Sequence, residues 1–320
     1  MLSESKLILG TRGSKLAIWQ ANWVKSRLGE RGRRIEIQVI RTSGDKRADV
    51  SVSNSGTKGL FIKEIEEALL AGEVDLAVHS LKDLPSSLPP GLVIGAVPAR
   101  EDARDVLITR DGSTFVQLPR GSRVATGSPR RVAQLRALRN DVELVPIRGN
   151  LDTRIRKLDS EACDALVLAA AGVHRLGLAS RIAGYFSIEQ IYPAVGQGAL
   201  AIEIRKRDTR VSQVVEFLED AATRRAVEAE RAALRDLGGG CLEPIAIHAF
   251  EKNGEFKIQG MVANAESGEM LRAALSGETC DAQNLGPRLA RALLERGAGR
   301  LLNLAPGPDA ASPASEKHHA

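Results

Sequence analysis

Apolar, strand-like segments alternate with segments of helical periodicity through the first half of the chain. The first strand is expected at residues 6–10, and the helix that follows it begins after Ser14, a good N-cap residue. Alternation of this kind predicts an α/β fold with largely parallel sheets. Such sheets bind ligands at the carboxyl ends of their strands, so the strand-to-helix junctions are the first places to search for a site.

The pattern changes after residue 240, where three strands and one helix predict a small antiparallel α+β unit. Residues 43–58 are rich in Gly, Ser, Thr and Asn and predict a long loop that is either functional or disordered. The Pro-, Ala- and Ser-rich tail from residue 305 predicts disorder. The other strands are expected at 34–40, 74–78, 105–109, 123–126, 142–147, 164–169, 244–250, 256–264 and 270–278, and the other helices at 60–70, 129–139, 151–160, 170–177 and 285–297.

The length of 320 residues exceeds one ordinary core and suits two or three domains. No apolar run approaches the roughly 20 residues that span a bilayer, and no secretory signal is evident, so a cytoplasmic protein without a membrane partner is expected. The three cysteines are too few for a disulfide framework, and neither they nor the five histidines have metal-ligand spacing. Cys163 and Cys280 are expected to be small buried hydrophobic residues.

The net charge of +5, from 45 basic and 40 acidic residues, permits an anionic partner. Aromatic residues make up only 3% of the chain, so stacking platforms for nucleic acid are scarce, and the basic residues are scattered. A polyanionic small molecule is the other candidate, and composition alone leaves both open.

Basic side chains recur at the strand-to-helix junctions. Helix N-termini attract anions, and an arginine fork pairs with a carboxylate through two hydrogen bonds. Arg130 and Arg131 would oppose the dipole of their helix, which indicates either a function or a mildly unfavourable surface pair. Because parallel strand ends converge, one cleft for several carboxylates or phosphates is predicted. Its candidates are Arg12 with Ser14, Arg130 and Arg131 with Thr126 and Ser128, Arg148 and Arg154 with Asn150, and Arg175.

Asp83 is an acid among many cations. A strand delivers Ser80, Lys82 and Asp83 to a turn that Pro85 ends. A carboxylate in such surroundings stays ionised and can stabilise a cationic intermediate or move a proton, although a structural salt bridge with Lys82 is the plainer alternative.

Cys241 follows three glycines. Such an arm suits a covalent attachment point or a nucleophile, and burial as a small hydrophobic residue is the alternative.

Together these segments resemble the hydroxymethylbilane synthase (porphobilinogen deaminase) family. Two departures are Gly127-Ser128, where many relatives have two serines, and Leu242-Glu243, where a polar and then an apolar residue is expected. The matching segments occur in the family's order at residues 11–14 with 16–21, 58–61, 75–85, 130–131, 148–150 with 153–154, 193–199 and 239–241.

The resemblance implies two periplasmic-binding-protein-like (type II) α/β domains plus a small C-terminal α+β domain with a three-stranded antiparallel sheet. Domain 1 would consist of residues 1–99 and a return segment, 200–218. Domain 2 would span 100–199, and domain 3, with the cofactor cysteine, 219–304, before a disordered tail at 305–320.

The resemblance also implies a transferase that condenses four porphobilinogen molecules head to tail, releasing ammonia, to give hydroxymethylbilane for haem, chlorophyll or corrin biosynthesis. A dipyrromethane cofactor would be joined to Cys241 through a thioether. The protein would be a cytoplasmic monomer that binds no nucleic acid.

The implied roles divide between charge pairing and chemistry. Asp83 would hold pyrrole N–H groups and stabilise the positive charge left by loss of ammonia. The loop 43–58 would be a lid, and Phe61 would pack against a pyrrole. The residues implied to bind cofactor or substrate are Arg12, Ser14, Lys58, Phe61, Ser80, Lys82, Thr126, Ser128, Arg130, Arg131, Arg148, Asn150, Arg154, Arg175 and Gln197. The rival interpretation is a non-catalytic anion-binding protein with the same two-domain cleft, which explains the arginines but gives no role to Asp83 or Cys241.

Overall fold

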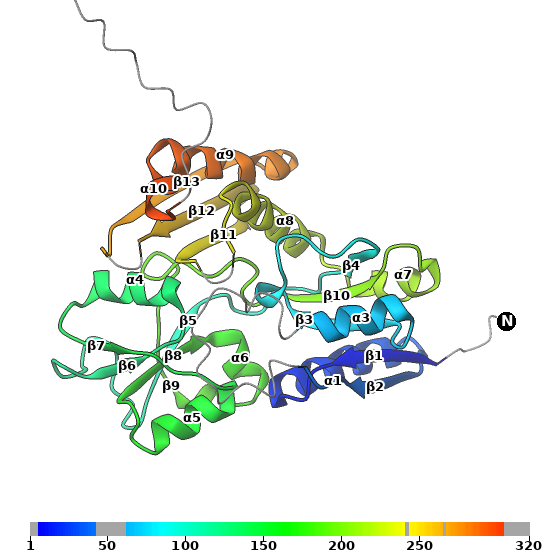
Figure 1. Ribbon diagram of the computed structural model, residues 1–320, viewed down its shortest axis with the longest axis horizontal. Coiled ribbons are helices and arrows are strands. Elements are labelled where there is room, and N and C mark those ends of the chain that lie inside the picture. Colours follow the sequence, from blue (N-terminus) through cyan, green and yellow to red (C-terminus); the bar gives the residue numbers. More distant parts are fainter. Residues whose placement is uncertain (1–5, 43–61, 241–242, 265–266, 304–320) are drawn as a thin grey trace, which may run out of the picture.

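The computed structural model describes residues 6–42, 62–240, 243–264 and 267–303. The predictions for Lys58, Phe61 and Cys241, for the lid at 43–58 and for the tail from 305 lie outside these residues. In Figure 1 the described chain forms three units, two of them side by side and the C-terminal one above their junction.

The first unit is built on a five-stranded sheet (Figure 1). Leu7 and Leu9 face helix α1, whereas Ile8 faces helix α3, because successive strand residues point to opposite faces. The strands, in sheet order, are β2 (Ile35–Val39), β1 (Leu7–Thr11), β3 (Leu76–Ser80), β10 (Leu200–Arg205) and β4 (Leu92–Ala96). The helices are α1 (Lys15–Gly29), α3 (Lys63–Ala71), η1 (Leu81–Asp83), α7 (Thr209–Val215) and η3 (Glu216–Leu218).

The second unit repeats this plan. Its core has two layers, because α5 and α6 cover one face of the sheet and α4 covers the other. The strands, in sheet order, are β7 (Glu143–Val145), β6 (Arg123–Ala125), β8 (Ala165–Ala169), β5 (Asp105–Thr109) and β9 (Ile182–Tyr185). The helices are α4 (Pro129–Leu138), α5 (Leu151–Asp159), α6 (Ala170–Arg175) and η2 (Ala179–Arg181).

Both sheets are mixed, so the prediction of largely parallel sheets is wrong for half of the strand pairs. In each sheet one strand, β10 or β5, runs antiparallel to both of its neighbours. The cause is connectivity. The chain enters each of these strands from a crossover between the units, at residues 97–104 and 186–199, and not from a helix packed on the same sheet. The amino ends of β5 and β10 therefore lie beside the carboxyl ends of β8 and β3.

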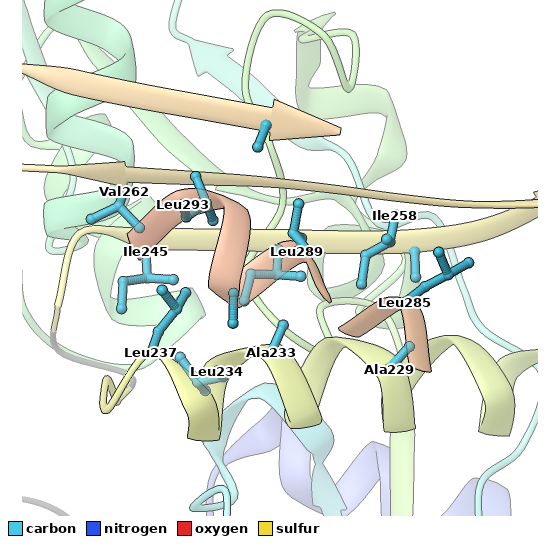
Figure 2. Close-up of a cluster of buried hydrophobic side chains, with 14 of the residues drawn as sticks. Ala229, Ala233, Leu234, Leu237, Ile245, Ile258, Val262, Leu285, Leu289 and Leu293 are labelled. Atoms are coloured by element: carbon cyan, nitrogen blue, oxygen red, sulfur yellow. The ribbon is translucent and has the colours of Figure 1, made fainter. Parts of the chain in front are cut away.

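The third unit packs two helices on a three-stranded antiparallel sheet. Figure 2 shows Ala229 and Ala233 of one helix and Leu285 and Leu289 of the other in the core beneath the sheet. A Cβ on Gly286 would lie 2.3 Å from the Ala229 carbonyl oxygen, so glycine is what lets the two helices approach. The elements are α8 (Ala221–Asp236), β11 (Ile245–Lys252), β12 (Glu255–Ala263), β13 (Met270–Glu278), η4 (Thr279–Asp281), α9 (Ala282–Glu295) and α10 (Ala298–Leu301).

A buried carboxylate joins the third unit to both crossovers. Glu230 of α8 is fully buried and pairs with Arg100 of the first crossover at 2.6 Å. The same side chain accepts a hydrogen bond of 2.7 Å from the backbone N–H of Gly196, in the return crossover. Glu230 therefore fixes α8 at the junction of the other two units.

The predicted fold class is confirmed by these three sheets. The expected elements match within a few residues, but β4, β9, β10, α7, α8, α10 and the single 3-10 turns have no counterpart among them. Cys163 is buried as expected, whereas the prediction for Cys280 is wrong because that residue is exposed, beside an acidic turn. Within the described ranges, no helix combines the length and the apolar character needed to cross a membrane.

Candidate active site

Two adjacent cavities lie where the three units meet. Cavity A is bounded by the first two units and by residues of the third, including Arg231 and Gly240. Cavity B lies between the first two units and is lined by the start of α1, the end of β3 and the amino ends of α5 and α6. The two cavities share four lining residues, which are Lys82, Asp83, Arg131 and Arg154.

Most of the predicted site residues that the structure describes line these cavities. Thr126 and Arg148 line neither: Thr126 is buried behind the wall and Arg148 points to solvent. Besides the four shared residues, Ser128, Arg130 and Gln197 line cavity A, and Arg12, Ser14, Ser80, Asn150 and Arg175 line cavity B.

Strand β3 ends directly in the shared wall. Its last residue, Ser80, accepts a hydrogen bond of 2.8 Å from the Gln20 side chain of α1. The next residue donates its N–H to the carbonyl of Ala199 in the return crossover. The single turn η1 then presents Lys82 and Asp83, and Asp83 is exposed in the wall. Burial lowers the pKa of the Lys82 ammonium to about 8, although the neighbouring Asp83 carboxylate opposes the shift.

Arg231 holds the chain beyond Asp83 from the third unit. Its guanidinium donates hydrogen bonds of 2.7 and 3.0 Å to the carbonyls of Pro85 and Ser86. The acid-bearing turn is therefore fixed on one side by the return crossover and on the other by α8.

Arg130 and Arg131 are buried, so the alternative of an unfavourable surface pair is wrong. Asp105, at the start of β5, lies 2.8 Å from both guanidinium groups. The Gln197 side chain donates to the same carboxylate at 2.8 Å. Burial alone would raise the pKa of the Asp105 carboxyl, but the two arginines outweigh it and hold that pKa well below the usual range.

Arg154 and Arg175 enter the cavities from two helices of the second unit, Arg154 from the first turn of α5 and Arg175 from the last turn of α6. The Nε of Arg154 donates to the Gly149 carbonyl at 2.8 Å, and Arg175 donates to the Gly198 carbonyl at 2.7 Å. Burial lowers the pKa of Arg175 to about 10 and also lowers that of Arg154. At neutral pH both remain cationic, in partly desolvated positions where they favour an anionic ligand.

The predicted N-caps differ in what their side chains do. Ser14 accepts a hydrogen bond of 3.3 Å from Ala17 N–H, whereas Ser128 and Asn150 occupy cap positions without a side-chain capping bond. The departure at Gly127 also has a local reason, because a Cβ there would lie 2.7 Å from the Ile147 carbonyl oxygen. In this backbone a serine at 127 would require the chain to shift.

Sequence reasoning missed Asp105 and Arg231. Asp105 begins a strand, and only strand carboxyl ends were searched, because parallel sheets were expected. Arg231 lies in α8, which had not been predicted. The sequence does carry one signal for Asp105: it is an acid that directly precedes the apolar run 106–108 in a chain with many basic residues.

Acidic, His and Cys side chains do not gather into a metal site in the part of the chain that the structure describes. The arrangement suits a different ligand: a molecule with several carboxylates whose centre lies against Asp83.

Comparisons with known proteins agree with this chemistry. The family model "Porphobilinogen deaminase, dipyromethane cofactor binding domain" matches residues 7–213, and "Porphobilinogen deaminase, C-terminal domain" matches residues 224–295. The porphobilinogen deaminase of Syntrophotalea carbinolica is 48% identical over 303 residues, which are 94% of this chain and 96% of the relative. That of Syntrophus aciditrophicus is 51% identical over 296 residues, 92% of this chain and 96% of the relative.

Among solved structures, a putative methionine-binding lipoprotein of Bacillus subtilis is 14% identical, with a TM-score of 0.42 over 68% of this chain and 92% of that one. Two family models that together span most of the chain, and relatives of near-equal length at about half identity, decide the assignment. The chain belongs to the porphobilinogen deaminase family.

Proposed function

We propose that this chain is a porphobilinogen deaminase, a transferase that joins four porphobilinogen molecules head to tail with release of four ammonia molecules. One water then cleaves the finished chain from the enzyme and supplies the hydroxyl group of hydroxymethylbilane. The observation that carries the proposal is the shared wall of the two cavities. Among the described residues, Asp83 is the one acid common to both cavities, and Lys82, Arg131 and Arg154 line both with it. Several cations around one carboxylate suit a polyanion that develops positive charge at its centre.

Cavity A fits the dipyrromethane cofactor of the family. Its cations, which include Arg130, Arg131 and Arg154, match the acetate and propionate carboxylates of a dipyrromethane, and Asp83 matches its pyrrole N–H groups. Gly240 also lines this cavity and directly precedes Cys241, so we assign Cys241 as the thioether attachment point. When bound, the cofactor supplies the electron-rich pyrrole to which the first substrate ring is joined.

Cavity B fits the incoming porphobilinogen. Arg12 and Arg175 approach from opposite sides of the cleft, one from the first unit and one from the second. Two carboxylates on one small ring can pair with both groups, and Ser80 and Asn150 add neutral polar contacts to the same cavity. The ring is thereby oriented against Asp83 before reaction.

We assign the electrostatic part of the reaction to Asp83. Loss of ammonia leaves a substrate ring that is electron-poor and protonated on nitrogen. An anionic carboxylate that is held in place stabilises this charge without reorganising, because the turn is fixed by Ala199 and Arg231. The surrounding cations hold the substrate carboxylates away from Asp83.

The assembly and domain plan are part of the proposal. We take the crossovers 97–104 and 186–199 as the links between domain 1 (1–99 and 200–218) and domain 2 (100–199), with domain 3 at 219–304.

We further propose that the protein acts as a monomer in the cytoplasm. Light scattering of the purified protein should give the mass of one chain, and a dimer mass would contradict the monomer.

The test of the function is a stoichiometric assay. Purified protein is incubated with porphobilinogen, and ammonia release is measured beside substrate loss. The proposal predicts repeated turnover with one ammonia released for each porphobilinogen consumed and hydroxymethylbilane as product. Saturable binding of porphobilinogen with no ammonia release would favour the anion-binding alternative instead.

A further inference from the structure

Three ionisable side chains, two of them buried, lie together on the opposite face of the first sheet from Ser80. His79 of β3 and Glu203 of β10 are 6% and 0% exposed, and their Nε2 and Oε2 atoms lie 3.0 Å apart. Glu66 of α3, a half-buried residue, acts electrostatically on both. The strand register explains the grouping, since Ala201 pairs with His79 and Glu203 pairs with Ala77, so all four point to one face.

This cluster lacks the hydrogen bonds that buried charges ordinarily have. Within the described ranges, neither carboxylate oxygen of Glu203 has a hydrogen-bond partner, and the buried Oε1 of Glu66 has none. The His79 contact with Glu203 is close enough for charge pairing but lacks hydrogen-bond geometry. Buried polar atoms without hydrogen bonds lower the free energy of unfolding. Gain or loss of one charge in this cluster should therefore change the stability of the surrounding structure.

Another charged group also lies between the sheet and α3. Arg205 of β10 donates hydrogen bonds of 2.9 and 2.6 Å to the carbonyls of Leu69 and Val74, and its own charge is paired with Asp75 and Asp208. The buried hydrophobic members of this layer include Ile65, Ala77 and Leu92. On α3 itself, Glu67 is exposed and pairs with Lys63. The charges that act on Glu66 are those of Glu203, which disfavours its ionisation, and of His79, which favours it.

The cluster lies directly behind the chemistry. His79 immediately precedes Ser80, and Asp83 follows within one turn. Glu203 lies on β10, the strand that the chain enters from the return crossover, whose Ala199 carbonyl holds the turn of Asp83. The turn of Asp83 continues β3 and is hydrogen-bonded to the residue that precedes β10. A change of charge between these two strands therefore acts on both elements that hold the turn.

We propose that Glu66, His79 and Glu203 form a proton-dependent positioning cluster for Asp83, in which a proton on Glu66 holds β3 and β10 in the geometry that catalysis requires. The effect of this cluster on catalysis rests on the proposed function, whereas its effect on folding does not. Burial raises the pKa of Glu66 from 4.5 to about 7, which places the loss of this proton near neutrality.

The sign of the effect on stability follows from proton binding. Between pH 4.5 and about 7 the folded chain keeps a proton on Glu66 that the unfolded chain has lost. Stability contributed by this proton is thus lost as pH rises through about 7. The Glu66→Gln variant carries no such proton, so its Tm relative to the wild type should rise across that window. The ratio of the unfolding equilibrium constants of the two proteins can change by at most about tenfold per pH unit. The actual change should be smaller because solvent reaches Glu66 and screens its charge.

The experiment measures Tm and kcat from about pH 5 to about pH 9 for the wild type, Glu66→Gln and the control Glu67→Gln. The control removes a carboxylate one residue along the same helix but on its exposed face. We expect Glu66→Gln, and not the control, to change the pH dependence of Tm and to increase kcat relative to the wild type above about pH 7. Two further variants give opposite shifts: His79→Asn should move the Glu66 transition to higher pH, and Glu203→Gln to lower pH.

The outcomes separate the parts of the proposal. A Tm profile of Glu66→Gln that runs parallel to the wild type would overturn the cluster. A changed Tm profile with an unchanged kcat profile would overturn the positioning of Asp83 and leave the cluster as a structural element. A wild-type chain that releases no ammonia from porphobilinogen would instead contradict the proposed function, and the Tm comparison would still decide whether the cluster exists.

Discussion

Asp83 and Asp105 are two aspartates that face the same group of cations from opposite sides. Asp83 lies exposed in the wall that the two cavities share, at the end of β3. Asp105 is fully buried behind that wall and lies within 2.8 Å of two arginines. The Asp83 carboxylate is open to a ligand, whereas the Asp105 carboxylate is already paired with Arg130 and Arg131.

The difference shows how a site can hold many cations and remain folded. Asp105 compensates Arg130 and Arg131 from behind, so that these arginines can be buried at the cavity edge without an uncompensated charge. Among the residues that the structure describes, Asp83 forms no buried ion pair, and its turn is held in place through the backbone. Removing Asp83 should therefore affect chemistry, and removing Asp105 should affect folding.

The largest expected effect is on turnover in Asp83→Asn. The variant keeps the shape of the side chain but removes the charge, so kcat should fall by at least about 100- to 1,000-fold, as when a fixed electrostatic stabiliser is lost. Its Tm should remain within a few degrees of the wild type because the side chain is exposed. A variant with near-normal kcat would remove Asp83 from the mechanism.

Asp105→Asn should show the opposite pattern. Two buried guanidinium groups would lose their counter-charge, which costs about 3–5 kcal/mol of folding free energy in urea unfolding. Because the pKa of Asp105 is held below its usual 3.8, this contribution is present at neutral pH and is lost only as pH falls below that value.

The matched control for Asp105→Asn is Asp159→Asn. Asp159 pairs with Arg181 on the surface at 2.6 Å, and its loss should cost less than about 1 kcal/mol. Equal destabilisation of the two variants would contradict the supporting role of Asp105.

Arg154→Leu should have an intermediate effect. Arg154 lines both cavities, so cofactor loading and kcat/KM should each fall by about tenfold to 100-fold, since hydrogen bonds to charged groups contribute about 1.5–3 kcal/mol. Arg156→Leu, two residues along the same helix but exposed and outside both cavities, is the control. Loading is measured as the fraction of protein with added mass, and a loss equal to that of the control would count against the carboxylate contact.

The smallest effect concerns the pH dependence of KM. The pKa of Lys82 is about 8, so its positive charge is lost as pH rises through that value. KM for porphobilinogen should then rise, by less than about tenfold for one partly solvated contact. Lys82→Arg should keep its charge and delay the rise to higher pH, and an identical KM profile in both proteins would exclude Lys82 as the titrating group.

Local sequence signals predicted much of the fold and part of the site. Helical and strand periodicity placed the elements around Ser14, Pro129 and Asp83 within a few residues of their observed bounds. The direction of β5 and β10 depends on crossovers between units, which periodicity does not record, and so Asp105 was missed. The caps at Ser128 and Asn150 were placed correctly, but the lack of a capping bond depends on tertiary geometry.

The most direct test of the central claim is the intact mass of the purified protein under denaturing conditions, with Cys241→Ser measured beside it. The account predicts that the wild type carries an excess mass equal to two condensed pyrrole units and that Cys241→Ser carries none. A wild-type mass equal to the bare sequence, and still unchanged after incubation with porphobilinogen or hydroxymethylbilane, would contradict the claim that this chain builds tetrapyrroles on a dipyrromethane held by Cys241.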